Sequence, residues 1–305
     1  MMRVKVFGWR GFTFRIPETW ELVHEKIGKK DGAFRIEDEY GPRMELSWER
    51  VPFTQMPEPK ESFEKMLKAM KKKNQNLKST GRREVQVYGH DGIASRLSFD
   101  EEHDAVVLHW YCEKSERLCT LFLYTLRKEY EKYSAIFNDI HRSLKCHGEK
   151  NFWYFYGFKM VLPNDFKLVY YRVTTGLSVA RFYRKKDNSY IILSYNGMAN
   201  ILLKEYYSSL EDWYSQVVRK DVEKLFGKFR KVSEESTVIG GHATKLLIYE
   251  KGIPLPLVKT TRRLRVALWK CDQTNRLYSF VTIFSEPKKG EEVPSEEILR
   301  SIYCH

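Results

Sequence analysis

The sequence predicts an α+β fold built from two tandem copies of an antiparallel sheet, each flanked by helices. The phrase GFTFRIPETW, at residues 11–20, returns in altered form as GFKMVLPNDF at residues 157–166. Later landmarks recur in the same order, and a repeat of this kind decides the fold class. Strand-like runs mostly follow one another without intervening helices, which favours antiparallel pairing. We therefore expect a first copy over residues 1–148 and a second over residues 149–305.

The two copies match at five further places along the chain. Each matched pair occupies the same kind of position in the two copies, such as a strand end, a helix start or a turn. The preserved order indicates duplication rather than chance similarity between two α+β segments. The matched pairs are Ser47-Trp48 with Ser194-Tyr195, Ser62-Phe63-Glu64 with Ser209-Leu210-Glu211, Gly92-Ile93-Ala94 with Gly241-His242-Ala243, Trp110-Tyr111-Cys112 with Trp269-Lys270-Cys271, and residues 142–147 with residues 300–305.

In the first copy, alternating apolar residues predict strands and apolar residues at helical spacing predict helices. The first strand ends at Pro17, which has no amide donor for a sheet. Residues 61–73 place apolar side chains on one face and charges on the other, as an amphipathic helix does. A second helix is expected over residues 130–144. The expected strands are residues 12–16, 20–27, 33–37, 43–51, 84–88, 93–99, 105–113 and 117–126.

The second copy repeats this arrangement of elements. A helix is expected over residues 210–226, and Pro294 precedes a last short helix, because proline favours the first turn. Long runs that follow a helix as hairpins favour antiparallel pairing here too. The expected strands are residues 158–162, 166–173, 178–183, 190–195, 236–239, 243–250, 259–271 and 277–285.

Length and composition exclude several classes of protein. With 305 residues the chain is long enough for two domains, since a domain of about 150 residues buries a sizeable core. No apolar run approaches the ~20 residues of a membrane helix. Residues 1–11 lack the continuous apolar core of a secretory signal. We expect a cytoplasmic protein, and the many Lys and Glu residues are typical of a thermophile.

The chain is basic, with a formal net charge of +13. Residues 1–148 hold 27 basic and 23 acidic side chains, whereas residues 149–305 hold 26 and 17. The positive excess is therefore concentrated in the second copy. Such a balance favours anionic partners, although a solvated lysine-rich surface gives the same count.

The opening phrase, the middle helix, the Gly-x-Ala strand and the final helix of each copy resemble the PsbP/Mog-type fold. That family includes the PsbP extrinsic protein of photosystem II and the Ran-binding Mog proteins. Trp20 matches the family's Pro-x-x-Trp start, and Phe166 replaces it in the second copy. The resemblance covers nearly all of each copy and implies an α/β/α sandwich that binds or assembles. It supplies no functional residue, because the family has no shared active site.

Four of the five cysteines occupy matching positions in the two copies. Cys112 and Cys271 end a strand-like run, and Cys146 and Cys304 follow the last helix. If each terminal helix packs on its own sheet, Cys112 approaches Cys146 and Cys271 approaches Cys304. One disulfide per copy is therefore a hypothesis, and such bonds occur in the cytosol of hyperthermophiles. Buried reduced thiols are the alternative, since cysteine is among the most buried residue types.

As a further alternative, the dipeptides Cys146-His147 and Cys304-His305 could each bind a soft metal together with the strand cysteine of the same copy. Adjacent residues of a helix point about 100° apart, so they share an ion only if the helix frays there. His90 and His242 fall at predicted turns, show no ligand spacing and are expected at the surface. The sequence therefore predicts no metal ligand and no cofactor.

Two stretches of the second copy are candidate contact surfaces. A basic strand is a candidate site for anions such as a nucleic-acid backbone, although alternation also fits an ordinary half-exposed strand. A proline-containing loop would expose apolar side chains to a partner, or would instead join the two copies. The basic residues are Lys259, Arg262, Arg263 and Arg265, and the apolar loop residues are Ile253, Leu255, Leu257 and Val258.

The sequence shows no phosphate loop, no GxSxG elbow, no zinc-protease helix and no redox CxxC pair, which are the common short motifs with a chemical mechanism. We therefore expect no catalytic residue. The best interpretation is a non-catalytic binding or assembly module of unknown ligand, which acts through a protein partner or self-association. Nucleic-acid binding by the basic second copy is the alternative. An enzyme with a cleft between the copies is a third hypothesis.

Overall fold

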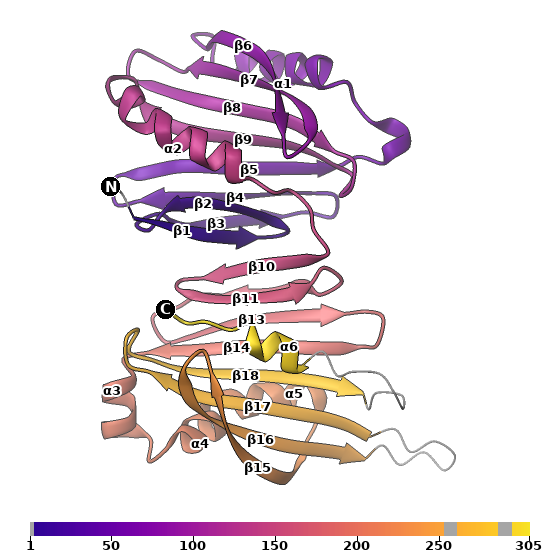
Figure 1. Ribbon diagram of the computed structural model, residues 1–305, viewed down its shortest axis with the longest axis vertical. Coiled ribbons are helices and arrows are strands. Elements are labelled where there is room, and N and C mark those ends of the chain that lie inside the picture. The colour runs from indigo at the N-terminus through magenta and orange to yellow at the C-terminus, as the bar shows by residue number, and fades with distance from the viewer. Residues whose placement is uncertain (1–2, 253–260, 286–294) are drawn as a thin grey trace. The chain divides into compact units, whose positions relative to one another are not determined.

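The computed structural model describes residues 3–252, 261–285 and 295–305. The chain forms two compact units, Met1–Phe152 and Trp153–His305. The described residues form two seven-stranded antiparallel sheets and two two-stranded sheets (Figure 1). The compact units divide within a strand, whereas the sequence predicted a division after Gly148, and that boundary between the copies stays a prediction.

The first large sheet has the strand order β3-β4-β5-β9-β8-β7-β6, and β1 pairs with β2 in a separate hairpin. Every neighbouring pair is antiparallel. The elements are β1 (Val4–Trp9), β2 (Phe12–Pro17), β3 (Glu21–Ile27), β4 (Asp31–Asp38), β5 (Gly41–Arg50), η1 (Phe53–Gln55), α1 (Pro59–Lys73), β6 (Lys78–Val87), β7 (His90–Ser98), β8 (His103–Cys112), β9 (Arg117–Leu126), η2 (Arg127–Glu129) and α2 (Tyr130–Ser143).

The second large sheet has the order β12-β13-β14-β18-β17-β16-β15, and β10 pairs with β11. This order is identical to that of the first sheet when β10 is set against β1, so the predicted repetition of a sheet domain is confirmed. The elements are β10 (Lys150–Phe155), β11 (Phe158–Pro163), β12 (Lys167–Arg172), β13 (Leu177–Arg184), β14 (Ser189–Gly197), α3 (Ala199–Ile201), η3 (Leu202–Tyr206), α4 (Leu210–Trp213), η4 (Tyr214–Val218), α5 (Arg219–Phe226), β15 (Arg230–Ile239), β16 (His242–Gly252), β17 (Thr261–Cys271), β18 (Arg276–Ser285) and α6 (Ser295–Arg300).

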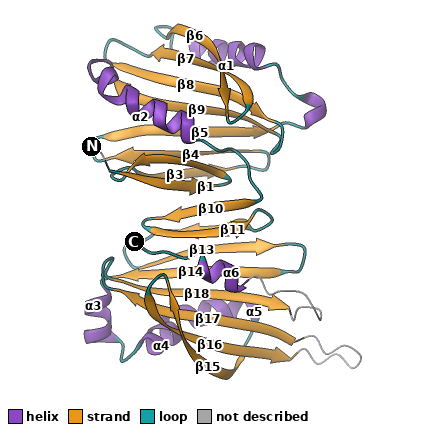
Figure 2. Cartoon of the chain, in the orientation of Figure 1, coloured by secondary structure: helices purple, strands orange, loops and turns teal. Residues whose placement is uncertain are grey.

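Strands dominate both copies, and helices are few (Figure 2). The prediction of antiparallel sheets is confirmed, and the helical share is smaller than α+β implied. Strands β1 and β10, which form hairpins with the predicted strands β2 and β11, were missed. The edge strands β6 and β15 are longer than predicted, because most of their residues are exposed and show no apolar alternation.

Helices α1 and α2 cover opposite faces of the first sheet. Phe63 of α1 packs in one apolar cluster with Leu97 of β7. The adjacent Arg96 places its guanidinium 3.9 Å from the ring centroid of Tyr130, the first residue of α2. Successive residues of a strand point to opposite faces, so the two helices lie on different sides of the sheet. Helix α2 also contacts β2 of the hairpin.

The helix predicted over residues 210–226 is interrupted. It consists of α4, a five-residue π-helical segment and α5. Ser209 caps the first segment by accepting a hydrogen bond of 3.1 Å from the Asp212 amide. Tyr214 and Val218, in the wide π turn, are both buried. The sequence periodicity did not show this widening, because single π turns leave most of the apolar face in place.

Among the described residues, no helix has both the length and the apolar character needed to span a membrane. The cytoplasmic location stays a prediction.

A buried polar group distinguishes the first sheet from the second. His109 Nε2 lies 2.9 Å from Ser62 Oγ, and His109 Nδ1 lies 2.9 Å from Thr120 Oγ1. Burial lowers the pKa of His109 from 6.5 to about 4, because the charged imidazolium loses its solvation. Trp110 and Trp269 are equivalent, so Leu268 stands at the matching place in the second sheet, where it is also buried.

His109→Leu is expected to weaken the pH dependence of stability. The folded-state pKa of His109 lies below its unfolded value, so its contribution is complete above pH 6.5 and is lost as pH falls towards 4. The linked loss is about 3 kcal/mol at most. Denaturant melts of both proteins between pH 7 and pH 4 measure it. Parallel stability profiles would show that His109 is not held neutral.

Candidate metal centres

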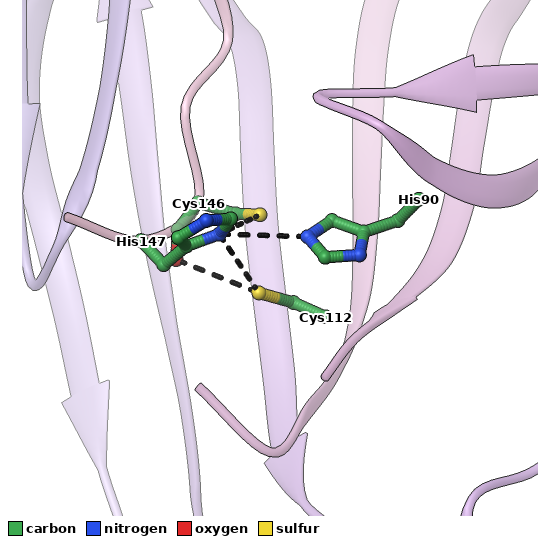
Figure 3. Close-up of side chains that lie close together, drawn as sticks. All are labelled: His90, Cys112, Cys146 and His147. Carbon is green, nitrogen blue, oxygen red and sulfur yellow. Dashed lines mark hydrogen bonds between the residues drawn. The ribbon is translucent and has the colours of Figure 1, made fainter. Parts of the chain in front are cut away.

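Each copy brings two histidines and two cysteines together. We define the first cluster as His90, Cys112, Cys146 and His147, and the second cluster as His242, Cys271, Cys304 and His305. Within each cluster, one nitrogen or sulfur atom per residue lies within 4.8 Å of the corresponding atom of every other member. Figure 3 shows the first cluster, with the His90 ring pointing towards the His147 ring and the two sulfurs.

The sheet register supplies two members of the first cluster. His90 begins β7 and Cys112 ends β8. These neighbouring strands are antiparallel, with Gly92 opposite Trp110. The same register, continued to the end of the two strands, sets His90 opposite Cys112. The start of β7 and the end of β8 therefore meet at the same end of the strand pair, although His90 and Cys112 are 22 positions apart in the sequence.

The segment after α2 supplies the other two members. Helix α2 ends at Ser143, and Leu144 is already extended. Lys145 forms an isolated antiparallel bridge with Thr13 of β2. Cys146 and His147 follow outside any helix. The 100° angle that separates adjacent side chains of a helix therefore does not prevent the two residues from sharing an ion. In the second copy, Tyr303 bridges to Lys159 of β11 in the same way.

The distances within the first cluster match those between donors around one zinc ion. His147 Nδ1 lies 3.4 Å from His90 Nε2, 3.4 Å from Cys112 Sγ and 3.5 Å from Cys146 Sγ. A tetrahedral zinc site with ordinary Zn–S and Zn–N bonds has donor separations of about 3.3–3.8 Å. The three separations from His147 therefore fit donors around one tetrahedral ion, and all four donor atoms lie within 4.8 Å of one another.

The second cluster has a similar geometry and uses the same atoms. His305 Nδ1 lies 3.6 Å from Cys271 Sγ and 3.7 Å from Cys304 Sγ. His242 Nε2 lies 3.1 Å from Cys304 Sγ. In both clusters the turn histidine offers Nε2 and the histidine after cysteine offers Nδ1. Each copy therefore presents the same donor set.

The structure corrects the sequence match around the turn before β7. Val87 pairs with His90 across one turn, and Ile239 pairs with His242 across the other. Gly89 and Gly241 adopt positive φ angles of 81° and 83° at equivalent places. His90 is therefore the counterpart of His242.

The sequence match had instead aligned Gly92-Ile93-Ala94 with Gly241-His242-Ala243. His90 and His242 were expected at the surface without ligand spacing; both are half-buried, and each lies among the donors of a cluster.

The electrostatic environment of the first cluster favours one thiolate. A hydrogen bond with Cys146 lowers the pKa of Cys112, and the side chain and backbone of Ser115 act in the same direction against burial. The hydrogen bond with Cys112 and burial raise the pKa of Cys146. The thiolate is the form that binds a metal or attacks a disulfide, and a thiol with a lowered pKa forms it readily.

A buried tryptophan lies at the same cysteine in each copy. Trp110 and Trp269 are completely buried, and their indole nitrogens make no conventional hydrogen bond to any described residue. The partner cysteine and burial raise the pKa of Cys146 and of Cys304. The indole N–H of the neighbouring tryptophan acts in the opposite direction and lowers each pKa. Burial without a partner is costly for a donor. A negatively charged sulfur at Cys146 and Cys304 would satisfy both indoles.

The five cysteines are all buried and free. The matched cysteines expected to approach each other do so, as Cys112 with Cys146 and Cys271 with Cys304. Their oxidation to disulfides stays a prediction. A disulfide and a metal site are alternative uses of the same sulfurs, because bound metal requires thiolates.

The predicted arginines lie in the first half of β17, whereas Cys271 of the second cluster ends the same strand. Arg262, Arg263 and Arg265 lie on β17, and Arg263 Nε donates to Glu250 Oε1 at 3.0 Å. This ion pair offsets part of the positive charge expected to bind anions. Lys259 lies outside the described residues, as do the apolar loop residues Ile253, Leu255, Leu257 and Val258. Anion binding and partner binding stay predictions.

Comparisons with known proteins support the fold only. No protein-family model matches the chain, and no curated protein matches it. The solution structure of cyanobacterial PsbP from Synechocystis sp. PCC 6803 is 15% identical, with a TM-score of 0.36 over 48% of this chain and 94% of that one. The Ran-binding protein Mog1p of Saccharomyces cerevisiae is 18% identical, with a TM-score of 0.31 over 48% and 90%.

The immunity protein TplEi of Pseudomonas aeruginosa is 9% identical, with a TM-score of 0.33 over 99% of this chain and 97% of that one. The weak, fold-level resemblance to PsbP and Mog proteins that the sequence predicted is confirmed. No functional residue is transferred from these structures.

Thiol counting distinguishes the two uses of the cysteines. Protein purified under reducing conditions is expected to show five alkylatable thiols after denaturation without reductant, as the free cysteines indicate. After metal removal and oxidation, the disulfide hypothesis predicts four hydrogens fewer in the intact mass, with Cys119 left free. A fully reduced mass after oxidation would contradict the disulfides. Loss of the Cys119 thiol would contradict their pairing.

Proposed function

We propose that the protein is a non-catalytic binding module that holds one zinc ion in each copy. The observation that carries this proposal is that two cysteine sulfurs and two imidazole nitrogens lie within 4.8 Å of one another in both clusters. Four protein donors fill the coordination shell of zinc, as in structural sites, and leave no position for a reacting water. The donor set therefore supports a binding role rather than catalysis.

The types of donor favour zinc over the common hard cations. Magnesium and calcium take oxygen ligands, and neither cluster contains a carboxylate. A tetrahedral set of two sulfurs and two nitrogens is typical of zinc. The indole N–H of Trp110 or Trp269 would donate to a coordinating sulfur, and such outer contacts tune a metal site.

Bound zinc would connect three separate segments of each copy. In the first copy these are the turn before β7, the end of β8 and the segment after α2. Cys112 and Cys146 are 34 positions apart, so an ion between them closes a long loop. Arg117 donates to the Cys146 carbonyl at 2.7 Å and to the Arg10 carbonyl at 2.9 Å, which supports the same junction. Zinc would therefore stabilise the folded state by mass action.

The helices on opposite faces of the first sheet support a finer description of each unit as a PsbP/Mog-like α/β/α sandwich. The partner of this module is a separate question from its metal. Protein binding and the nucleic-acid alternative of the basic second copy both remain hypotheses, and neither involves the clustered donors.

Zinc titration of reduced, metal-free protein is expected to give two ions per chain. Cys146→Ser removes a sulfur from the first cluster and should leave one ion, and Cys304→Ser should do the same for the second. The double variant should bind none. Elemental analysis after desalting, and competition with a chromophoric chelator, measure the stoichiometry. Zinc should also raise the melting temperature of the wild type, because it binds the folded state.

His103→Ala is the matched control, because this histidine is exposed and lies outside both clusters. It should keep two ions. Absence of zinc from reduced, folded wild-type protein would overturn the proposal. Two ions in folded Cys146→Ser would place the metal elsewhere. Circular dichroism of each variant without zinc shows whether a lost ion reflects a lost donor or a lost fold.

A further inference from the structure

The two clusters differ at one position of the turn that precedes the first histidine. Tyr88 and Gly89 precede His90, whereas Gly240 and Gly241 precede His242. Tyr88 has a φ of 52° and Gly240 a φ of 54°, so the backbones of the two turns match. A non-glycine residue with positive φ is uncommon. The tyrosine is therefore an unusual choice for this turn.

The Tyr88 side chain covers one donor of the first cluster. Its ring centroid lies 4.9 Å from that of His147. Tyr88 is itself 42% exposed, so the ring lies on the solvent side of the cluster. His147 is half-buried. Tyr88 therefore covers part of the His147 ring.

The second cluster has no such cover from its turn. A Cβ atom on Gly240 would lie 2.9 Å from the Ile302 carbonyl oxygen, which is closer than a carbon side chain tolerates. A side chain like that of Tyr88 therefore does not fit there. His305, the counterpart of His147, is exposed. Its ring packs at its edge against His242, with centroids 5.2 Å apart, and this contact is within the cluster itself.

We propose that the second cluster exchanges its zinc with thiol-bearing ligands, whereas the first cluster retains its zinc. This inference rests on the proposed function. An incoming thiol would lose its proton to the imidazole of His305 as that nitrogen leaves the zinc, and the new thiolate would take the vacated position. One Zn–N bond breaks, one Zn–S bond forms, and no electron is transferred. Cys271, Cys304 and His242 would hold the ion during this substitution.

The same step is hindered in the first cluster. Movement of His147 into solvent would break its contact with Tyr88, whereas the cysteines of the two clusters are equally buried. Contacts around a metal site commonly change its properties by about 10- to 100-fold. We therefore expect release from the second cluster to be faster by at least about 10-fold.

Release of zinc from the fully loaded chain to excess 4-(2-pyridylazo)resorcinol, with and without glutathione, tests this difference. Two phases of equal amplitude are expected, one ion each. Glutathione should accelerate the fast phase more than the slow one. Cys304→Ser should lack the fast phase, and Cys146→Ser should lack the slow phase. Tyr88→Gly, which copies the second turn, should bring the slow rate close to the fast one.

Tyr40→Ala is the control, because Tyr40 is 80% exposed and is no member of either cluster. It should leave both phases unchanged. Release of two ions at one rate would overturn this inference and leave the proposed zinc sites intact. A fast phase that persists in Cys304→Ser, or a slow phase unaffected in Tyr88→Gly, would also overturn it. A chain that binds no zinc would end both proposals.

Discussion

Both clusters depend on a short antiparallel bridge near the end of each copy. Lys145 and Thr13 exchange backbone hydrogen bonds of 2.8 and 2.9 Å, and Tyr303 and Lys159 exchange bonds of 3.0 and 2.6 Å. This pairing fixes the backbone directly before each Cys-His dipeptide. It therefore carries two donors to the edge where the antiparallel register of the large sheet has already placed the other two. The hairpin outside each sheet thus has a role beyond covering apolar side chains.

The duplicated sheets could be predicted from the sequence, because apolar alternation and the repeated opening phrase survive in both copies. The clusters could be predicted only in part: the Cys-His dipeptides and the strand cysteines were singled out, but His90 and His242 were missed. The similarity of Gly92-Ile93-Ala94 to Gly241-His242-Ala243 placed the copies out of register and hid the equivalence of His90 and His242. The turn glycines, Gly89 and Gly241, carry the signal that would have corrected it, since both have positive φ.

A second reason is that helix ends are poorly defined by periodicity. The prediction extended the last helix of the first copy to residue 144, and a Cys-His pair close to a helix has the wrong angular spacing for one ion. The structure ends α2 at Ser143, and the chain continues as an extended bridge.

The duplication allows the two copies to be compared within one chain. The donor atoms are the same in both copies, while the turn residues Tyr88 and Gly240 differ. A shared donor set with different surroundings favours a common ligand.

Anomalous diffraction from crystals of the reduced, zinc-supplemented protein tests this account most directly. Data collected above and below the zinc absorption edge reveal each ion and its position. We predict two anomalous difference peaks per chain, one between His90, Cys112, Cys146 and His147 and one between His242, Cys271, Cys304 and His305. Well-ordered clusters without a peak, or zinc bound at other residues, would contradict the central claim that the paired cysteines and histidines are metal ligands.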